Sequence, residues 1–203
     1  MTGTVRITSH IILLLCGLLP LQAQSLSSVG VMAAGAASTQ SWSYTKGASP
    51  ETGYRIGYGA GLFVEGFRAR GISFIWELWY LQRGLTTKVG AAAVEPSLTY
   101  ISMPILMKVR FGDDGFAYYL TAGPRIEYLF HIEPQRMTAL TDALSEGESD
   151  FGVSAGAGIQ FPLGPVPDLH LECRYTMSIL PIYNSDALTI RNSSIDLLLG
   201  IGF

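Results

Sequence analysis

Residues 191–203, RNSSIDLLLGIGF, decide the fold of this chain. An alternation of large apolar residues with small or mostly polar ones, with a period of two, is typical of a β-strand that has two different faces. The stretch ends on an aromatic residue, as the strands of outer-membrane barrels do, and we expect it to be the closing strand of such a barrel. The apolar face carries Ile195, Leu197, Leu199, Ile201 and Phe203, and the other face carries Ser194, Asp196, Leu198, Gly200 and Gly202.

The overall composition agrees with a membrane β-barrel. The 203 residues predict one domain, with 48% apolar and only 14% charged residues and a mean hydropathy of +0.31. After Pro20, however, the sequence has no run of about 18 apolar residues, the length that a membrane-spanning helix requires. The net charge is −3 and no basic tract is present, so nucleic acid is not an expected partner.

The first 23 residues have the pattern of a secretory signal peptide. Arg6 supplies the positive charge, residues 11–19 form a short apolar core, and Ala23 is a small residue suited to the cleavage site. We expect cleavage after Ala23, so residues 24–203 form the outer-membrane β-barrel domain.

The rest of the chain divides into eight strand segments. The predicted fold class is all-β: an eight-stranded antiparallel transmembrane β-barrel, an up-and-down meander with short periplasmic turns and longer outer loops. The expected strands are residues 28–36, 54–66, 72–83, 98–111, 116–130, 150–161, 169–179 and 191–203.

The connections between these segments alternate between long and short. Four polar stretches, residues 37–53, 84–97, 131–149 and 181–190, read as long loops, and residues 137–144 in the third could form a helical turn. The short connections, residues 68–71, 112–115 and 162–167, read as turns. Pro104 predicts weakened pairing or a bulge in the fourth strand.

The composition of the two strand faces predicts which face points inward. The more polar face is rich in glycine, serine and threonine, which suit the narrow interior of an eight-stranded barrel. The apolar face places aromatic residues near the strand ends, in two belts like those at membrane interfaces. A soluble barrel with an apolar interior is the alternative. The predicted outer belt contains Tyr54, Tyr80 and Tyr128, and the periplasmic belt contains Phe111, Phe116, Phe161 and Phe203.

The inward face also carries charges of both signs. Since an interior charge is unfavourable unless it is paired or hydrated, we expect a hydrogen-bonded, salt-bridged network that fills and rigidifies the barrel. The alternative is a path for protons or small solutes. The predicted network contains Arg55, Glu77, Arg125, Glu127, His170, Glu172, Arg174 and Asp196, with Glu65, Arg83, Lys108 and Arg110 as further inward residues.

The sequence contains no pattern that predicts catalysis, a metal site or a cofactor site. Ser178 and His170 share a strand face, but eight residues of extended chain separate them by roughly 26 Å. They therefore cannot form a nucleophile and its base. We expect a non-enzymatic protein without cofactors.

Several motifs together resemble the PorT-like family of outer-membrane β-barrels, which is common in Bacteroidetes-type bacteria. They are ELWYLQRG at residues 77–84, YISMPILMK at residues 100–108, the pair Gly123-Pro124 and the closing LLLGIGF. The resemblance implies an eight-stranded barrel in the bacterial outer membrane. The founding member of the family is linked to a protein-secretion system, so it also implies an accessory role in secretion as one possible function.

Three functions remain open from the sequence: a structural or interaction protein, which we favour, an accessory component of a secretion system, and a narrow conductor. The expected partners are outer-membrane lipid, the outer-membrane assembly machinery, which would read Phe203 as a C-terminal signal, and proteins at the outer loops. Loop residues suited to such contacts are Trp42, Tyr44, Lys88 and Tyr183.

Overall fold

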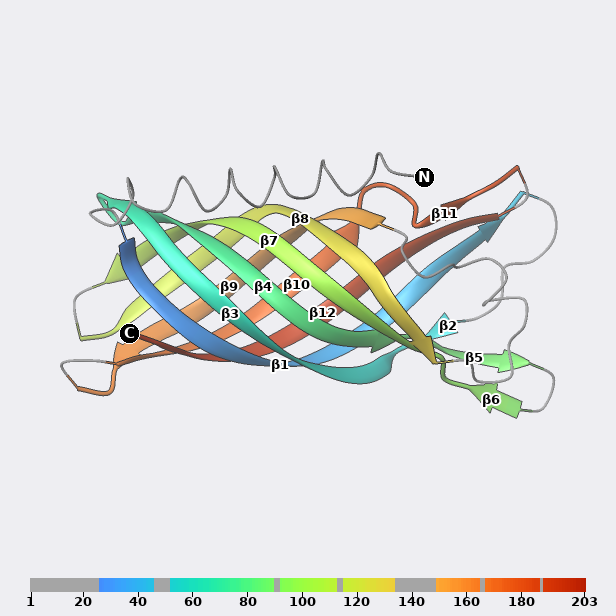
Figure 1. The fold of residues 1–203 in the computed structure, drawn as a ribbon, viewed down its shortest axis with the longest axis horizontal. Helices are drawn as coiled ribbons and strands as arrows, with labels where there is room; N and C mark the ends of the chain where they lie inside the picture. Colours follow the sequence, from blue (N-terminus) through green and yellow to red (C-terminus); the bar gives the residue numbers. More distant parts are fainter. Residues whose placement is uncertain are drawn as a thin grey trace, which may run out of the picture.

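Eight long strands form the wall of a closed antiparallel barrel in the computed structural model (Figure 1). The structure describes residues 26–45, 52–89, 92–112, 115–133, 149–164, 167–186 and 188–203. The predicted signal peptide lies outside these residues. The long strands are β1 (Leu26–Tyr44), β3 (Arg55–Ala69), β4 (Ile72–Gly84), β7 (Ser97–Gly112), β8 (Ala117–Glu133), β9 (Ser149–Pro162), β10 (Asp168–Ser178) and β12 (Leu188–Gly202).

Each long strand pairs with the next in the chain, and β12 returns to pair with β1. The closing register runs from Gly30 opposite Gly202 to Tyr44 opposite Leu188. The backbone N–H of Phe203 donates to Val29 O at 2.7 Å, and the N–H of Val29 donates back to Phe203 O at 2.9 Å. The predicted eight-stranded meander, closed by its first and last strands, is therefore confirmed.

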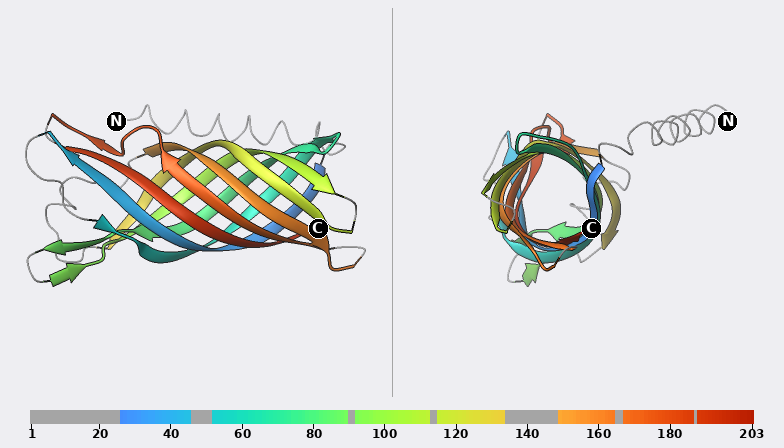
Figure 2. Two further views of the ribbon diagram at one scale, coloured as in Figure 1. Left: turned by 180° about the vertical axis from the view of Figure 1, so that it is seen from behind. Right: turned by 90° about the vertical axis from the view of Figure 1, so that its left-hand side faces the viewer.

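The two ends of the barrel differ (Figure 2). The turns after β3, β7 and β9 and the end of β12 lie at one end, which we call the turn end. The opposite, loop end carries four short strands: β2 (Thr52–Gly53), β5 (Thr86–Val89), β6 (Ala92–Val94) and β11 (Tyr183–Asn184). Strands β2, β5 and β6 form a small sheet of their own, and β11 pairs with β12.

The first strand is longer than the sequence predicted. We expected residues 28–36 as strand and residues 37–53 as loop, but β1 continues to Tyr44. The extra residues Ser38, Gln40 and Trp42 alternate inward and are buried. Polar side chains that face a polar lumen have the composition of a loop, which explains the error.

The other three predicted loops also contain strand, and residues 181–190 hold β11 and the start of β12. Residues 84–97 hold the β5–β6 hairpin, and β8 extends through His131 to Glu133. The predicted helical turn at residues 137–144 lies outside the described residues. Within the described part of the chain, no helix is long and apolar enough to cross a membrane.

Pro104 interrupts the pairing of its strand without shifting the register. In the β4–β7 ladder, Trp76 pairs with Ile105 and Trp79 with Ser102, and the two positions between them are unpaired. The missing N–H of proline accounts for the gap. Of the two predicted effects, weakened pairing is confirmed and a bulge is not found there.

The outward face of the barrel is apolar and exposed along all the long strands. The predicted outer belt lies near the loop end, with Tyr54 62%, Tyr80 48% and Tyr128 44% exposed. At the turn end, Phe116 stacks on Phe161 at a ring-centroid distance of 6.4 Å. In water this much contiguous apolar surface would aggregate, so the outward face requires an apolar environment.

Candidate functional site: the polar lumen

The inward face carries the polar residues that the sequence placed in the lumen. All eight residues of the predicted network belong to long barrel strands, and all except the half-buried Arg55 are buried. Alternation along the strands explains this placement, because residues two apart share a face of the sheet. The side chains form three successive groups along the barrel axis.

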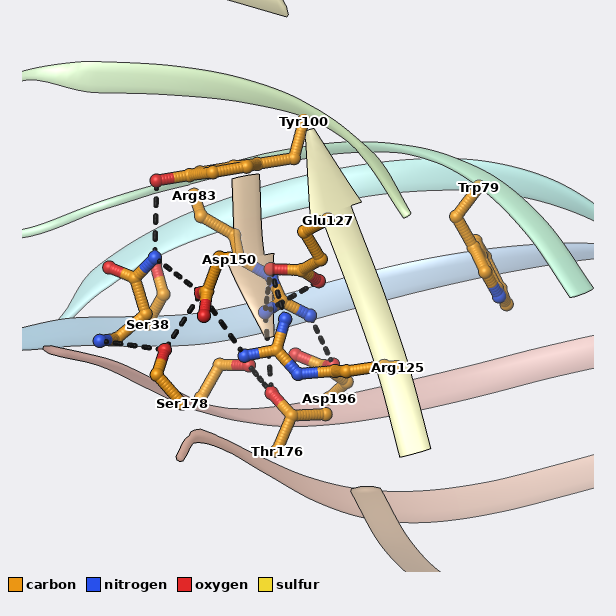
Figure 3. A network of polar contacts seen from close by, with 12 residues as sticks. Ser38, Trp79, Arg83, Tyr100, Arg125, Glu127, Asp150, Thr176, Ser178 and Asp196 are labelled. Carbon is orange, nitrogen blue, oxygen red and sulfur yellow. Dashed lines mark hydrogen bonds and ion pairs between the residues drawn. The ribbon is translucent and has the colours of Figure 1, made fainter. Parts of the chain in front are cut away.

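The group nearest the loop end, which we call the outer cluster, consists of Arg83, Arg125, Glu127, Asp150 and Asp196 (Figure 3). Arg83 bridges two carboxylates, with Nη1 3.1 Å from Glu127 Oε1 and Nη2 3.0 Å from Asp196 Oδ2. Arg125 pairs with Glu127 on its own strand and lies 3.4 Å from Asp150 Oδ2. The cluster therefore links β4, β8, β9 and β12 across the lumen.

Neutral side chains extend the outer cluster toward the loops. Ser178 Oγ donates to Asp150 Oδ2 at 2.7 Å, and Asn192 Nδ2 donates to the same oxygen at 3.0 Å. Asn192 Nδ2 also lies 3.1 Å from the Tyr100 hydroxyl, and Gln40 Nε2 donates to Asn192 Oδ1 at 2.9 Å. The two hydrogen bonds to Asp150 Oδ2 satisfy a carboxylate oxygen whose burial without partners would be unfavourable.

A second group, the inner cluster, lies closer to the turn end and consists of Glu77, Thr121, Glu172 and Arg174. Arg174 grips Glu77 with both terminal nitrogens, at 2.6 and 2.9 Å, and its Nε donates to Glu172 Oε1 at 2.7 Å. Thr121 Oγ1 donates to the same Glu172 oxygen at 2.8 Å, and Trp79 Nε1 donates to Glu77 at 2.7 Å. A two-nitrogen arginine–carboxylate contact fixes geometry as well as charge.

The third group surrounds Lys108 at the turn end. Lys108 Nζ donates to Glu65 Oε2 and to Gln160 Oε1, both at 2.8 Å. Ser73 Oγ donates to the other Glu65 oxygen at 2.7 Å, and Gln160 Nε2 donates to Asp168 at 2.7 Å. Lys108 and Glu65 thus form an ion pair without net charge near the turn end.

Glycines on the inward face of β9 provide the space for these clusters. A Cβ atom at Gly156 would fall on the carboxylate of Glu172 and on Thr121 Oγ1. A Cβ atom at Gly152 would collide with Met177 O and press on the Arg125 guanidinium. The glycines that the sequence predicted to face the lumen are therefore positions that larger side chains from the adjacent strands β8 and β10 fill.

Apolar residues also enter the lumen, which the sequence did not predict. One cluster lies at the loop end, and we call it the apolar plug; another packs beside the inner cluster. The sequence of β4 could have indicated this, because its more polar face includes the apolar residues Ile75, Trp79 and Leu81. The apolar plug contains Trp42, Leu85, Leu98, Tyr100, Leu129, Ile132, Ile182 and Ile190, and the other cluster contains Met32, Ala34, Phe63, Ile75, Trp79, Leu81, Leu106 and Leu198.

The space left between these layers is small. A cavity of about 10 Å³ lies between the outer and inner clusters, lined by residues that include Arg83, Arg125, Ser154 and Asp196. A volume of ~10–15 Å³ admits one water molecule. Pockets for organic ligands measure roughly 300–1,000 Å³, so this cavity has no room for a cofactor or substrate.

Ser178 and His170 do not come together in the lumen. Ser178 Oγ bonds to Asp150 and accepts the backbone N–H of Asn192 at 3.1 Å. His170 packs near the turn end, with its ring 5.4 Å from Phe63 and 6.2 Å from Tyr119. Among the described residues, no group of three or more His, Cys, Asp or Glu side chains is placed to hold a metal ion.

Two of the four residues predicted as loop contacts lie elsewhere. Trp42 is a buried member of the apolar plug, and Tyr183 packs partly buried against the plug. Tyr44 is 39% exposed at the end of β1. The side chain of Lys88 lies outside the described part of the structure.

Three polar residues in or beside the outer cluster are among the lumen residues that sequence reasoning missed. Asp150, Tyr100 and Asn192 link the outer cluster to the apolar plug, yet the predicted inward charges did not include Asp150. The sequence could have predicted that Asp150 points inward, because it shares a strand face with Gly152 and Ser154. The hydrogen bonds of Asn192 to Tyr100 and to Asp150 join residues far apart in the chain, so no local sequence pattern predicts them.

A closed barrel with an apolar exterior and a packed polar interior defines the class of outer-membrane β-barrel proteins. The chain belongs to the family described as "Outer membrane protein beta-barrel domain", whose model matches residues 22–184. No curated protein matches the chain. Family membership supports a location in the outer membrane and thereby an exterior in contact with lipid. Short turns of such barrels face the periplasm, so the turn end is periplasmic and the loop end is outer.

Solved structures share this fold at low sequence identity. The outer membrane protein OprG from Pseudomonas aeruginosa is 12% identical, with a TM-score of 0.59 over 88% of this chain and 97% of that one. Neisserial surface protein A is 13% identical, with a TM-score of 0.49 over 87% of this chain and 99% of that one. The N-terminal barrel domain of P. aeruginosa OprF is 16% identical, with a TM-score of 0.43 over 89% of this chain and all of that one. The likeness to OprG shows a common fold.

Proposed function

We propose that this protein is a non-enzymatic outer-membrane barrel that acts as a structural or interaction protein, with a solid lumen and an outer contact surface. One observation carries the proposal: three arginines, Arg83, Arg125 and Arg174, each bridge two carboxylates inside the barrel. Such bridges cross-link the strands. Because the lumen is filled and the wall faces lipid, the outer loops are the surface at which a partner can bind.

The solid lumen argues against the narrow-conductor alternative. The apolar plug lies at the loop end, and the clusters below it fill the barrel. In planar-bilayer recordings we expect no unit conductance from the wild-type protein. A 16-stranded porin, whose lumen is an aqueous channel, serves as the positive control in the same bilayer. Unit conductance of the wild-type barrel would refute the solid-lumen proposal.

Photo-crosslinking in cells tests the contact surface directly. The crosslinker replaces Tyr44 or Asp186, which are both exposed at the loop end. Thr45 Oγ1 donates to Asp186 O at 2.7 Å, so these two sites lie close together although they are distant in sequence. Leu163, exposed at the turn end, is the matched control. We expect a protein adduct from the loop-end sites and not from Leu163; adducts absent at both loop-end sites contradict an interaction role.

The second candidate function is an accessory role in a protein-secretion system. The motifs at residues 77–84 and 100–108, which resemble the PorT-like family, favour it. A strain without the protein is then expected to retain cargo in the periplasm, and the wild-type gene to restore export. Normal export from the deletion strain refutes this candidate and leaves the first one standing.

Absence of catalysis is testable in the same strain. The Ser178–His170 separation and the small cavity both support a non-enzymatic protein. We expect lipid extracts from the deletion strain to match those of the parent. A lipid species that accumulates in the deletion strain and disappears on complementation would identify an enzyme instead.

A further inference from the structure

We propose that the turn between β3 and β4 binds the phosphate headgroup of an anionic diacyl phospholipid in the periplasmic leaflet. The inference uses the location in the outer membrane and is independent of what the outer loops contact. It combines a strained backbone, a lipid-facing aromatic pair and two exposed arginines.

The backbone of this turn is strained. The β3–β4 register passes from Gly66 opposite Phe74 to Ala69 opposite Ile72, so two β3 residues, Phe67 and Arg68, lie opposite Ser73 alone. Phe67 has φ 55° and Arg70 has φ 51°. Left-handed conformations favour glycine, and a bulky residue in one is an outlier. Outliers of this kind collect at functional positions, where the surrounding structure maintains them.

The bulge presents an aromatic ring to the lipid. Phe67 is 46% exposed and meets the Trp76 ring edge-to-face at a centroid distance of 5.7 Å. Trp76 in turn lies 6.5 Å from the Phe74 ring. Aromatic rings at the end of a transmembrane strand reside at headgroup level. Phe67 therefore places the turn next to lipid phosphates.

The charge of this turn is unlike that of the other two turns. Residues 66–73, GFRARGIS, contain two arginines and no acid, whereas residues 112–115, GDDG, contain two acids, and residues 162–167, PLGPVP, contain no charge. Arg68 and Arg70 are both exposed. The backbone N–H of Arg110 donates to Gly71 O at 2.7 Å, which holds the turn against β7.

The lumen carboxylate that interacts with Arg68 already has another cation beside it. Arg68 is within electrostatic range of Glu65, but Glu65 is already paired with Lys108 at 2.8 Å. Guanidinium groups bind phosphate with two parallel hydrogen bonds, and they suit this role better than ammonium groups do. A phospholipid phosphate is the anion present at this depth, and an anionic headgroup retains a net negative charge beside the two arginines.

Trp76 offers a built-in reporter for the test. It is one of three tryptophans, and it is 36% exposed, whereas Trp42 and Trp79 are 7% and 2% exposed inside the barrel. The folded protein is reconstituted into phosphatidylcholine vesicles that contain either brominated phosphatidylglycerol or brominated phosphatidylcholine. Bromine quenches tryptophan on contact, so the ratio of quenching measures the preference for the anionic lipid at Trp76. A Trp76→Phe variant confirms that the quenched signal comes from this residue.

We expect the anionic lipid to be preferred by at least about fivefold, the factor that one basic residue near an anionic surface contributes, and by about thirtyfold when both arginines contribute in full. Arg68→Gln with Arg70→Gln is expected to reduce the preference to about one. Arg191→Gln, an exposed arginine on the opposite end of the barrel, is the matched control and leaves the preference unchanged. Heat-modifiable migration on gels identifies the variants that are folded. The Arg70→Lys variant keeps the positive charge, and we expect it to retain most of the preference for the anionic lipid.

Equal quenching by the two lipids in the wild-type protein overturns the proposal. So does a preference that survives the double glutamine variant, because it would come from the barrel as a whole. Neither outcome affects the crosslinking result at Tyr44 and Asp186, so failure here is distinguishable from failure of the proposed function.

Discussion

The lumen face and the lipid face of this barrel are built by the same strands but behave as opposite environments. On β8, Arg125 and Glu127 are 2% and 0% exposed, whereas Ile126 between them is 42% exposed. The buried core of this protein is largely polar, and its exposed surface is apolar. Burial and apolarity therefore separate in this barrel, because lipid replaces water outside.

The two faces differ in what they require of a side chain. Each lumen residue must meet a particular partner, because an unpaired buried charge is strongly destabilising. The lipid face requires only apolar character, which many side chains supply. Substitutions should therefore be tolerated much better outside than inside, as long as they remain apolar.

The largest effect is expected from removing the arginine of the inner cluster. Arg174→Met leaves Glu77 and Glu172 buried without their cation, and we expect the free energy of unfolding to fall by about 3–5 kcal/mol. Urea titration of the barrel in lipid vesicles measures it. A second variant, Arg174→Met with Glu77→Met, removes one stranded carboxylate and should recover part of the loss. A loss below about 1 kcal/mol for the single variant would contradict a buried, mutually dependent cluster.

A charge on the lipid face is expected to have the next largest effect. Leu197 is 61% exposed and lies halfway between Arg191 and Phe203 on β12. We expect Leu197→Arg to lower the free energy of unfolding by about 2–4 kcal/mol, the range for a basic residue at the bilayer midplane. Leu197→Ile is the control and should be nearly neutral in the same titration. If both variants unfold like the wild type, this face is not in hydrocarbon.

The same substitution, glycine to alanine, can be made once on each face of the barrel. Gly156→Ala places a methyl group against Glu172 and Thr121, and we expect a loss of about 1–3 kcal/mol from overpacking. Gly35→Ala on the outward face of β1 meets no atom within 4 Å and should be neutral or slightly stabilising. Parallel urea titrations measure both. Equal effects of the two substitutions would mean that the lumen is loosely packed near Glu172.

The smallest effect on stability is expected at the end of the chain. The Phe203 side chain is 61% exposed, and its backbone bonds to Val29 survive truncation of the ring, so Phe203→Ala should change the free energy of unfolding by less than about 1 kcal/mol. Assembly in cells should fall much more, if the ring is the signal that the assembly machinery reads.

Two measurements separate these effects for Phe203→Ala: the folded fraction in isolated outer membranes and the refolding yield in lipid vesicles. Phe116→Ala, another aromatic residue of the turn-end belt, is the matched control. Equal folded fractions for the two variants in cells would contradict an assembly role for Phe203.

Much of the architecture was predictable from the sequence because strand alternation is a local property. The eight long strands, their order and the inward parity of residues such as Arg174 and Asp196 all followed from a period of two. The end of β1 was mispredicted, since Ser38 and Gln40 are polar in the lumen just as they would be in a loop. The β5–β6 hairpin was missed because its strands are only four and three residues long.

The candidate site was predictable as a set of residues but not as a set of contacts. Arg83 and Asp196 are 113 residues apart in the chain, and Gln40 and Asn192 are 152 apart. Which inward charge meets which depends on the stagger of the strands around the barrel. The same is true of Trp42, whose place in the apolar plug depends on residues from three other strands, β7, β8 and β12, and from the segments just before β5 and β11.

By itself, therefore, the sequence determined that this chain forms a barrel, which face of each strand points inward and that residues 191–203 form its last strand. Those properties depend on residues two apart, and each stretch carries them independently. Only the tertiary structure decided that the apolar plug gathers at the loop end and that three arginines each join two carboxylates. The contacts of Arg83 with Asp196 and of Arg174 with Glu77 arise because closure of β1 on β12 brings side chains from non-adjacent strands within hydrogen-bonding distance.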